Sequence, residues 1–144
     1  MLEDAPDAFT ITADSERGRP LSWWRERLVA TCADPKRVAL VAEIGDDAVG
    51  SALGVIDTWD RSLSHLYALW VSPQARRRGV AGALVDRVFE WARERGAATV
   101  ELSVTVGNVA ATKLYEGAGF CDTGDREPLR PGSPLKLMKM RAPL

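Results

Sequence analysis

The chain has 144 residues and a formal net charge of −1, so it is long enough to bury the core of one domain. A molecule so close to neutral does not attract polyanions over its whole surface, which argues against a general nucleic-acid-binding protein. Its composition, 46% hydrophobic and 27% charged, is that of an ordinary globular domain.

The same residues give no sign of a leader or a membrane anchor. The start is acidic without an apolar run, and no window approaches the roughly 18 apolar residues of a membrane span. Cys32 and Cys121 lie far apart in no metal or redox spacing, which suits a reducing compartment. We therefore expect a single-domain cytoplasmic protein with no membrane contact and no bound metal.

The first part of the chain predicts irregular structure followed by one helix. Residues 1–20 are polar and interrupted by Pro and Gly, which indicates a loop or a short irregular helix. We expect Ser22 to cap a helix over residues 23–33. Trp24, Leu28 and Cys32 recur every four residues and should face the core.

The rest of the chain alternates strands and helices, which predicts a mixed α/β fold. The strand over 64–71 is apolar, which favours a central place with both faces covered. The helix over 80–95 carries an apolar stripe and ends at Gly96, a residue suited to the turn after a helix. The expected elements are strands at 38–44, 48–56, 64–71, 99–105 and 135–141, a short strand from Phe120, and helices at 80–95 and 108–118.

The stretch Val71-Ser72-Pro73-Gln74-Ala75-Arg76-Arg77-Arg78-Gly79-Val80-Ala81-Gly82 joins the central strand to the next helix. The N-terminus of a helix presents unpaired backbone N–H groups and the positive end of the helix dipole. Gly79, Ala81 and Gly82 leave room for an anion to approach that backbone. We therefore predict a phosphate-binding cradle here, whereas the three arginines alone would indicate only a solvated basic run.

A second motif follows the strand over 99–105. Asn108 and Tyr115 lie seven residues apart, which places them on nearly one face of a helix and about 10 Å apart along its axis. Gly119 and Phe120 end that helix and open the next strand. Each motif alone is weak, because a tyrosine on an amphipathic helix is commonly a core residue. The two in this order are much more specific.

In combination the two motifs resemble those of the GNAT superfamily of N-acetyltransferases. Residues 69–82 are similar to its acetyl-CoA motif Leu-x-Val-x-Pro-x-x-Arg-x-x-Gly-x-Gly/Ala, and residues 108–120 to its motif Asn-x-x-Ala-x-x-Leu-Tyr-Glu-x-x-Gly-Phe. The resemblance covers roughly residues 38–141. It implies an α/β fold with a mixed, mostly antiparallel sheet, and transfer of an acetyl group from acetyl-CoA to a primary amine.

The resemblance also assigns roles to residues. The backbone of residues 69–71 would pair with pantetheine, and the amides of residues 77–82 would hold the pyrophosphate. Asn108 would bind the pantetheine or acetyl region, and Tyr115 would act as general acid beside the thioester sulfur. The expected cofactor-binding residues are Leu69, Trp70, Val71, Arg76, Arg77, Arg78, Gly79, Val80, Ala81, Gly82 and Asn108.

The expected reaction involves two proton transfers, one to the leaving thiolate and one from the amine. A tyrosine with a pKa of about 10 gives its proton to a thiolate near 8.5 at a cost of roughly 2 kcal/mol, so Tyr115 serves partly as a hydrogen-bond donor. An amine with a pKa of about 10.4 costs on the order of 4–5 kcal/mol to deprotonate at pH 7. A base must therefore take that proton.

The identity of this base stays open at the sequence level. Where many relatives have a glutamate on the strand before the second motif, this chain has Ser103. Glu101, two residues earlier on the same strand face, is the first candidate, and His65 is the second. A proton relayed by water is the third. Neither cysteine lies in a nucleophile setting, which favours direct attack without a covalent acyl-enzyme.

The chain also departs from the family at its start, because it opens at a segment that usually follows a first strand and helix. Either the native chain starts upstream of Met1, or the sheet lacks those elements and its exposed edge favours a homodimer. The alternative to an enzyme is a non-catalytic acyl-CoA-binding or interaction module with the same fold. A nucleic-acid module that uses the arginines would lose affinity steeply with salt, and the net charge disfavours it.

Overall fold

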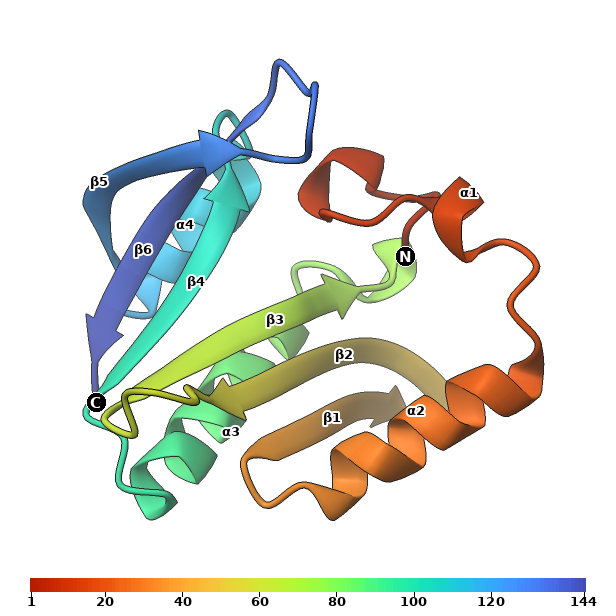
Figure 1. Ribbon diagram of the computed structural model, residues 1–144, viewed down its shortest axis with the longest axis horizontal. Coiled ribbons are helices and arrows are strands. Elements are labelled where there is room, and N and C mark those ends of the chain that lie inside the picture. Colours follow the sequence, from red (N-terminus) through yellow and green to blue (C-terminus); the bar gives the residue numbers. More distant parts are fainter.

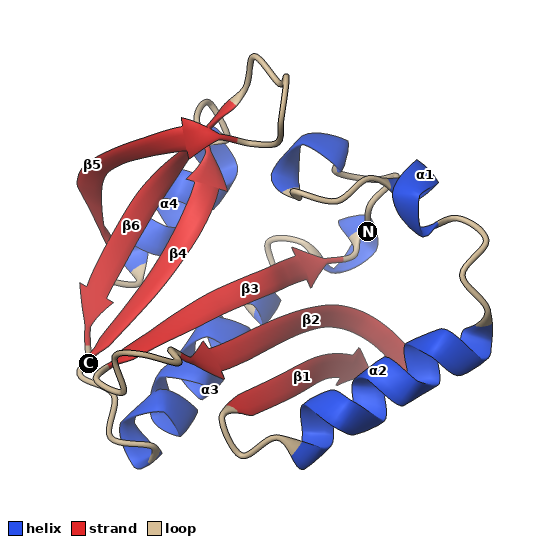
Figure 2. Cartoon of the chain, viewed as in Figure 1, coloured by secondary structure: helices blue, strands red, loops and turns tan.

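The computed structural model describes residues 1–144. In chain order its elements are η1 (Pro6–Ala8), α1 (Ala13–Glu16), α2 (Leu21–Ala33), β1 (Arg37–Ile44), β2 (Asp47–Ile56), β3 (Leu63–Val71), η2 (Pro73–Ala75), α3 (Val80–Glu94), β4 (Thr99–Thr105), α4 (Val109–Gly117), β5 (Cys121–Pro128) and β6 (Lys136–Pro143). Six strands form one sheet in the order β1-β2-β3-β4-β6-β5 (Figures 1 and 2). Every neighbouring pair is antiparallel except β3 and β4, which confirms a mixed, mostly antiparallel sheet.

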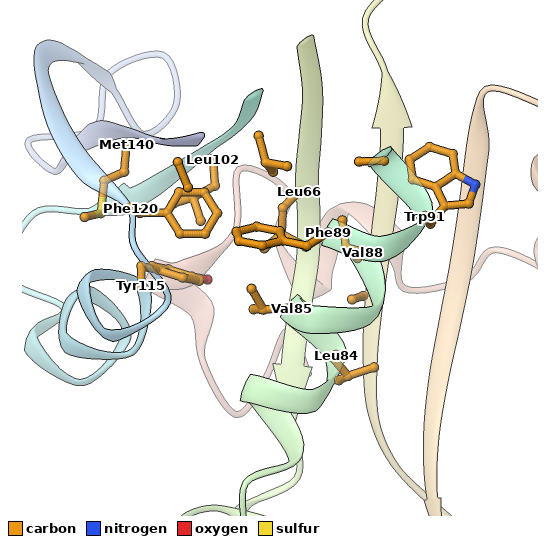
Figure 3. Packing of buried hydrophobic residues seen from close by; sticks show 14 of the residues in the cluster. Leu66, Leu84, Val85, Val88, Phe89, Trp91, Leu102, Tyr115, Phe120 and Met140 are labelled. Atoms are coloured by element: carbon orange, nitrogen blue, oxygen red, sulfur yellow. The ribbon is translucent and has the colours of Figure 1, made fainter. Parts of the chain in front are cut away.

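The core lies between the sheet and helices α3 and α4, which share one of its faces (Figure 1). Helix α3 buries Leu84, Val85, Val88, Phe89, Trp91 and Ala92, so the predicted stripe is confirmed. Phe120, at the end of α4, joins the two helices: its ring centroid lies 5.4 Å from that of Phe89 and 5.8 Å from that of Tyr115 (Figure 3). Burial of this apolar surface positions both helices against the strands.

Helix α4 begins and ends as predicted. The side chain of Asn108 accepts a hydrogen bond from the backbone N–H of Ala111 at 3.2 Å, which caps the helix. Gly119 follows the helix with φ of 91°, and Gly96 follows α3 with φ of 82°. Glycine suits both turns because its left-handed conformation carries no Cβ clash.

Two predictions about helix α2, its cap and its buried face, are wrong. The helix begins at Leu21 after Pro20, and no side chain caps it, so Ser22 is not its cap. None of its residues is buried; Leu28 is 56% exposed, Trp24 is 40% exposed and Cys32 is also exposed. The four-residue spacing predicted the helix but not its surroundings, because α2 packs mainly against β1 at the edge of the sheet.

Strand β3 is central in the sheet, as predicted, but only one of its faces is fully covered. Ser64 and Leu66 are buried against the α3 face. The opposite face carries His65 and Tyr67, and Tyr67 is 50% exposed. The apolar run therefore overstated the burial of this strand, and the open face holds ionisable side chains.

Strands β3 and β4 pair only at their first residues, from Leu63↔Thr99 to His65↔Glu101, and then diverge (Figure 1). A bulge accompanies the divergence: the register between β2 and β3 shifts between Ser51 and Leu53, and Ala68 adopts φ of 51°. Left-handed backbone is unusual for alanine, and such bulges turn a strand and end its pairing. The two strands thus form a V whose vertex lies at the His65–Glu101 pair.

Strand β1 is an edge of the sheet and bonds to β2 alone. The helical segments η1, α1 and α2 precede it, and no strand lies among residues 1–36. No helix has the length and apolar character needed to cross a bilayer.

Candidate active site

A cavity of about 500 Å³ occupies the open end of the V. Its walls come from the end of β3, the turn before α3, the first turn of α3, helix α4 and the N-terminal segment. The predicted site residues that line it are Leu69, Trp70, Val71, Arg76, Arg77, Gly79, Val80, Ala81, Gly82, Asn108 and Tyr115. The structure thus brings together all of the predicted set except Arg78 and Glu101.

The turn before α3 has the geometry of an anion cradle. Gly79, at the N-cap position of α3, adopts φ of 82°, and Arg77 adopts φ of 58°. No side chain caps the helix, so the first backbone N–H groups of α3 have no partner within the helix. These donors and the helix dipole are what a helix N-terminus offers to a phosphate group.

Arg76 is engaged within the protein. Its Nε donates to the carbonyl oxygen of Val71 at 3.2 Å, and its guanidinium pairs with the carboxylate of Asp4. The indole Nε1 of Trp70 donates to the same carboxylate at 3.1 Å. Arg76 therefore ties the N-terminal segment to the end of β3, and Arg77 is the arginine left to face an anion in the cavity.

Asn108 and Tyr115 both line the cavity from α4, in agreement with their predicted shared face. Because the side-chain oxygen of Asn108 caps the helix, its amide NH₂ group is what it can offer a ligand. Tyr115 is 9% exposed, and Figure 3 shows its hydroxyl directed toward α3. Burial raises the pKa of Tyr115 to about 12, so its phenol is a neutral hydrogen-bond donor across the ordinary pH range.

Glu101 lies outside the cavity, at the vertex of the V, and is 7% exposed. Its carboxylate accepts a hydrogen bond from Nε of Arg141 at 2.7 Å and pairs with Nζ of Lys139 at 3.5 Å. The remaining neighbour is His65, whose Nδ1 lies 3.7 Å from Oε1 of Glu101. The first and second candidate bases of the sequence analysis are therefore adjacent residues of one cluster.

Two residues of this region escaped the sequence analysis. Asp4 meets Trp70 and Arg76 across more than 60 positions of the chain, and no local pattern indicates such a contact. Asp57 lies 3.0 Å from Nε2 of His65. The β2–β3 hairpin register, Val55↔His65 and Ile56↔Ser64, would have placed Asp57 beside that histidine.

Comparison with known proteins identifies the family of the chain. The family model described as "Acetyltransferase (GNAT) family" matches residues 1–120. The N-acetyltransferase 8F1 of Rattus norvegicus is 39% identical over 118 residues, which cover 72% of this chain and 53% of the relative. The chain spans 53% of the length of this relative and 32% of the length of another curated relative.

Solved structures share the fold. The ribosomal-protein-alanine N-acetyltransferase of Brucella melitensis superposes with a TM-score of 0.75 at 26% identity, over 90% of this chain and 82% of that one. An acetyltransferase of Bacillus anthracis, solved in complex with acetyl coenzyme A, superposes with a TM-score of 0.72 over 81% of this chain and 68% of that one. At 21% identity the second likeness concerns the fold alone.

Proposed function

The chain belongs to the GNAT acetyltransferase family, and on that premise we propose that it transfers an acetyl group from acetyl-CoA to a primary amine by direct attack. The single observation that carries the proposal is the cavity at the open end of the V. It combines an uncapped helix N-terminus, diverging strands and the hydroxyl of Tyr115. Each of these features meets one part of the donor: the pyrophosphate, the pantetheine arm and the thioester.

In this proposal the pyrophosphate lies on the first turn of α3 and the pantetheine arm runs along residues 69–71. The divergence of the strands supports this placement, because β3 pairs with β4 only as far as His65 and residues 69–71 have no partner strand on that side. The carbonyl of Val71 already accepts a bond from Arg76, so other backbone groups of this segment would pair with the arm. Asn108 would donate to the same arm through its free amide group.

Tyr115 would stabilise the leaving thiolate by donating a hydrogen bond rather than a proton. A transfer from a phenol of pKa about 12 to a thiolate near 8.5 is uphill by roughly 5 kcal/mol. The donor bond needs no such transfer and strengthens as negative charge develops on sulfur. The thiolate would then take its proton from water.

The amine proton would go to the cluster at the vertex of the V. Glu101 is held by Arg141 and Lys139, so we assign proton acceptance to His65 and the stabilisation of the resulting imidazolium to Glu101. In the reaction the amine nitrogen forms a bond to the acetyl carbon, the bond from that carbon to sulfur breaks, and the amine proton moves to the imidazole. The products are an amide and coenzyme A.

Release of coenzyme A with a panel of primary amines tests the proposal. We expect Tyr115→Phe to lower kcat on the order of 10²-fold while acetyl-CoA binding is retained, because only the transition-state hydrogen bond is lost. Binding of acetyl-CoA without transfer to any amine would instead support the non-catalytic module. Unchanged turnover in Tyr115→Phe would contradict the role of the phenol.

The exposed edge of β1 supports a second proposal, that two copies associate there. Among residues 1–144, no strand pairs with the outer side of β1, and Val41 on β1 is 61% exposed. Leu21 on the adjacent α2 is 72% exposed. Unpaired edges of this kind favour pairing between chains. Sedimentation should show a dimer that Val41→Lys shifts to monomer, and a monomer at all concentrations would contradict it.

A further inference from the structure

His65 lies between two carboxylates that come from different parts of the fold. Its Nε2 is 3.0 Å from Oδ2 of Asp57, in the loop after β2, and its Nδ1 is 3.7 Å from Oε1 of Glu101 on β4. Tyr67 stacks on the imidazole with ring centroids 5.6 Å apart. The side chain of His65 is 16% exposed, so the ring is held in place but can still be reached.

Asp57 is itself fixed by its loop. Its Oδ1 accepts hydrogen bonds from the backbone N–H groups of Trp59 and Asp60, each at 2.8 Å. These bonds, first that from Asp60, and the bond from His65 lower the pKa of Asp57 to about 2. An ionised carboxylate only accepts hydrogen bonds, so Nε2 of His65 must be the donor in this contact.

The protonation state of Nδ1 then follows by elimination. A neutral imidazole carries one N–H, so a proton on Nε2 leaves a lone pair on Nδ1. The 3.7 Å between Nδ1 and Glu101 exceeds the length of a hydrogen bond, and Glu101 is already engaged by Arg141 and Lys139. The free lone pair therefore faces β4 at the point where β3 and β4 begin to diverge.

We propose that Asp57 is a positioning residue, which fixes the tautomer of His65 so that Nδ1 receives the amine proton at the vertex of the V. The proposal rests on the acetyl transfer proposed above. Neither Asp57 nor His65 lines the cavity; Asp57 acts through the imidazole, which lies where β3 and β4 begin to diverge. Its negative charge also faces the imidazolium that forms when Nδ1 takes the proton, and the imidazolium afterwards returns this proton to water.

Asp57→Asn is the sharpest test because it keeps the loop and reverses the hydrogen bond. The asparagine oxygen can still accept from Trp59 and Asp60, while its amide would donate to Nε2 and force the proton of His65 onto Nδ1. Asp60→Asn is the matched control, since Asp60 lies in the same loop and bonds to Ser62 rather than to the histidine.

The chain contains one histidine, so its ring nitrogens can be assigned without ambiguity by long-range ¹H–¹⁵N NMR. For neutral His65 we expect the wild type and Asp60→Asn to carry the proton on Nε2, and Asp57→Asn to carry it on Nδ1. Steady-state kinetics should show kcat lowered about 100-fold in Asp57→Asn with an unchanged KM for acetyl-CoA, and near-normal values in Asp60→Asn.

Two results would overturn the proposal: a wild type with the proton on Nδ1, or an Asp57→Asn variant with the tautomer exchanged and kcat equal to that of Asp60→Asn. A failure of the proposed function looks different. In that case the wild type itself would release no coenzyme A with any amine, while the NMR measurement would still report the tautomer that Asp57 sets.

Discussion

Helices α2 and α3 have similar lengths but opposite environments. Helix α2 has 13 residues and buries none of them, whereas α3 has 15 residues and buries six. Both carry several large apolar side chains. The difference lies in what each helix meets: α3 lies across the strands of the sheet, while α2 meets the edge at β1 (Figure 2).

The arrangement of apolar residues explains part of this contrast. In α3 they recur at three- and four-residue spacing and form one continuous stripe. In α2 the side chain of Trp23 is surrounded by arginines, with the guanidinium of Arg19 4.1 Å and that of Arg27 5.3 Å from its ring centroid. Arginines that lie over an aromatic ring let it remain near solvent, so this part of α2 needs no cover by the core.

The largest expected difference between the helices is in stability. Phe89→Ala should lower the free energy of unfolding by about 3–5 kcal/mol, because it removes a buried ring that packs on Phe120. Leu28→Ala should cost less than about 1 kcal/mol, because that side chain is mostly in solvent. Urea unfolding of both variants measures the difference. Equal losses of unfolding free energy in the two variants would contradict the exposure of Leu28 on α2.

The contact between α3 and β2 gives a second, smaller effect. A Cβ on Gly54 would lie 3.0 Å from the ring of Trp91 and 2.9 Å from Cγ1 of Val38, so Gly54→Ala should cost about 1–3 kcal/mol. Gly117→Ala is the control: nothing lies within 4 Å, and the helical backbone of α4 should gain about 0.5–1 kcal/mol. A stable Gly54→Ala variant would show that α3 can move away from β2.

The smallest expected effect is the dependence of the free energy of unfolding on the ionisation of Tyr115, which arises only at alkaline pH. Below pH 10 the tyrosine is protonated in both the folded and the unfolded chain. Between pH 10 and about 12 the unfolded chain ionises while the buried phenol does not, so the free energy of unfolding should fall over this range. Alkaline titration followed by circular dichroism should show this fall, and Tyr115→Phe should remove the part that Tyr115 contributes.

The sequence predicted those elements whose apolar pattern matches the way they pack in the fold. Strands β1 to β4 and β6, helix α3 and the cap at Asn108 follow from periodicity and from residues with strong positional preferences. Strand β5 was expected only as a short strand from Phe120, whereas it runs over Cys121–Pro128 and shows no alternation of buried and exposed residues. The cavity residues were predictable as a group because two motifs lie on adjacent elements. The four-residue spacing of apolar residues predicted α2, but the expectation that these residues face the core was wrong.

The side-chain contacts at the vertex of the V could not be predicted from local sequence patterns. The contacts of His65 with Asp57 and Glu101 depend on the hairpin register and on the short parallel pairing of β3 with β4. The bond between Asp4 and Trp70 depends on how the N-terminal segment crosses the end of β3. Such contacts are set by the whole fold, so the sequence singled out Glu101 as a candidate base but indicated none of its partners.

The most direct test of the account is thermal unfolding in the presence of acetyl-CoA. At a hundred times its Kd, the ligand should raise the free energy of unfolding of the wild type by about 2.7 kcal/mol. Gly82→Trp fills the cradle from a position with open space around Cβ and should abolish this gain, whereas Gly117→Trp, equally open but outside the cavity, should keep it. No stabilisation of the wild type at millimolar acetyl-CoA would contradict the account.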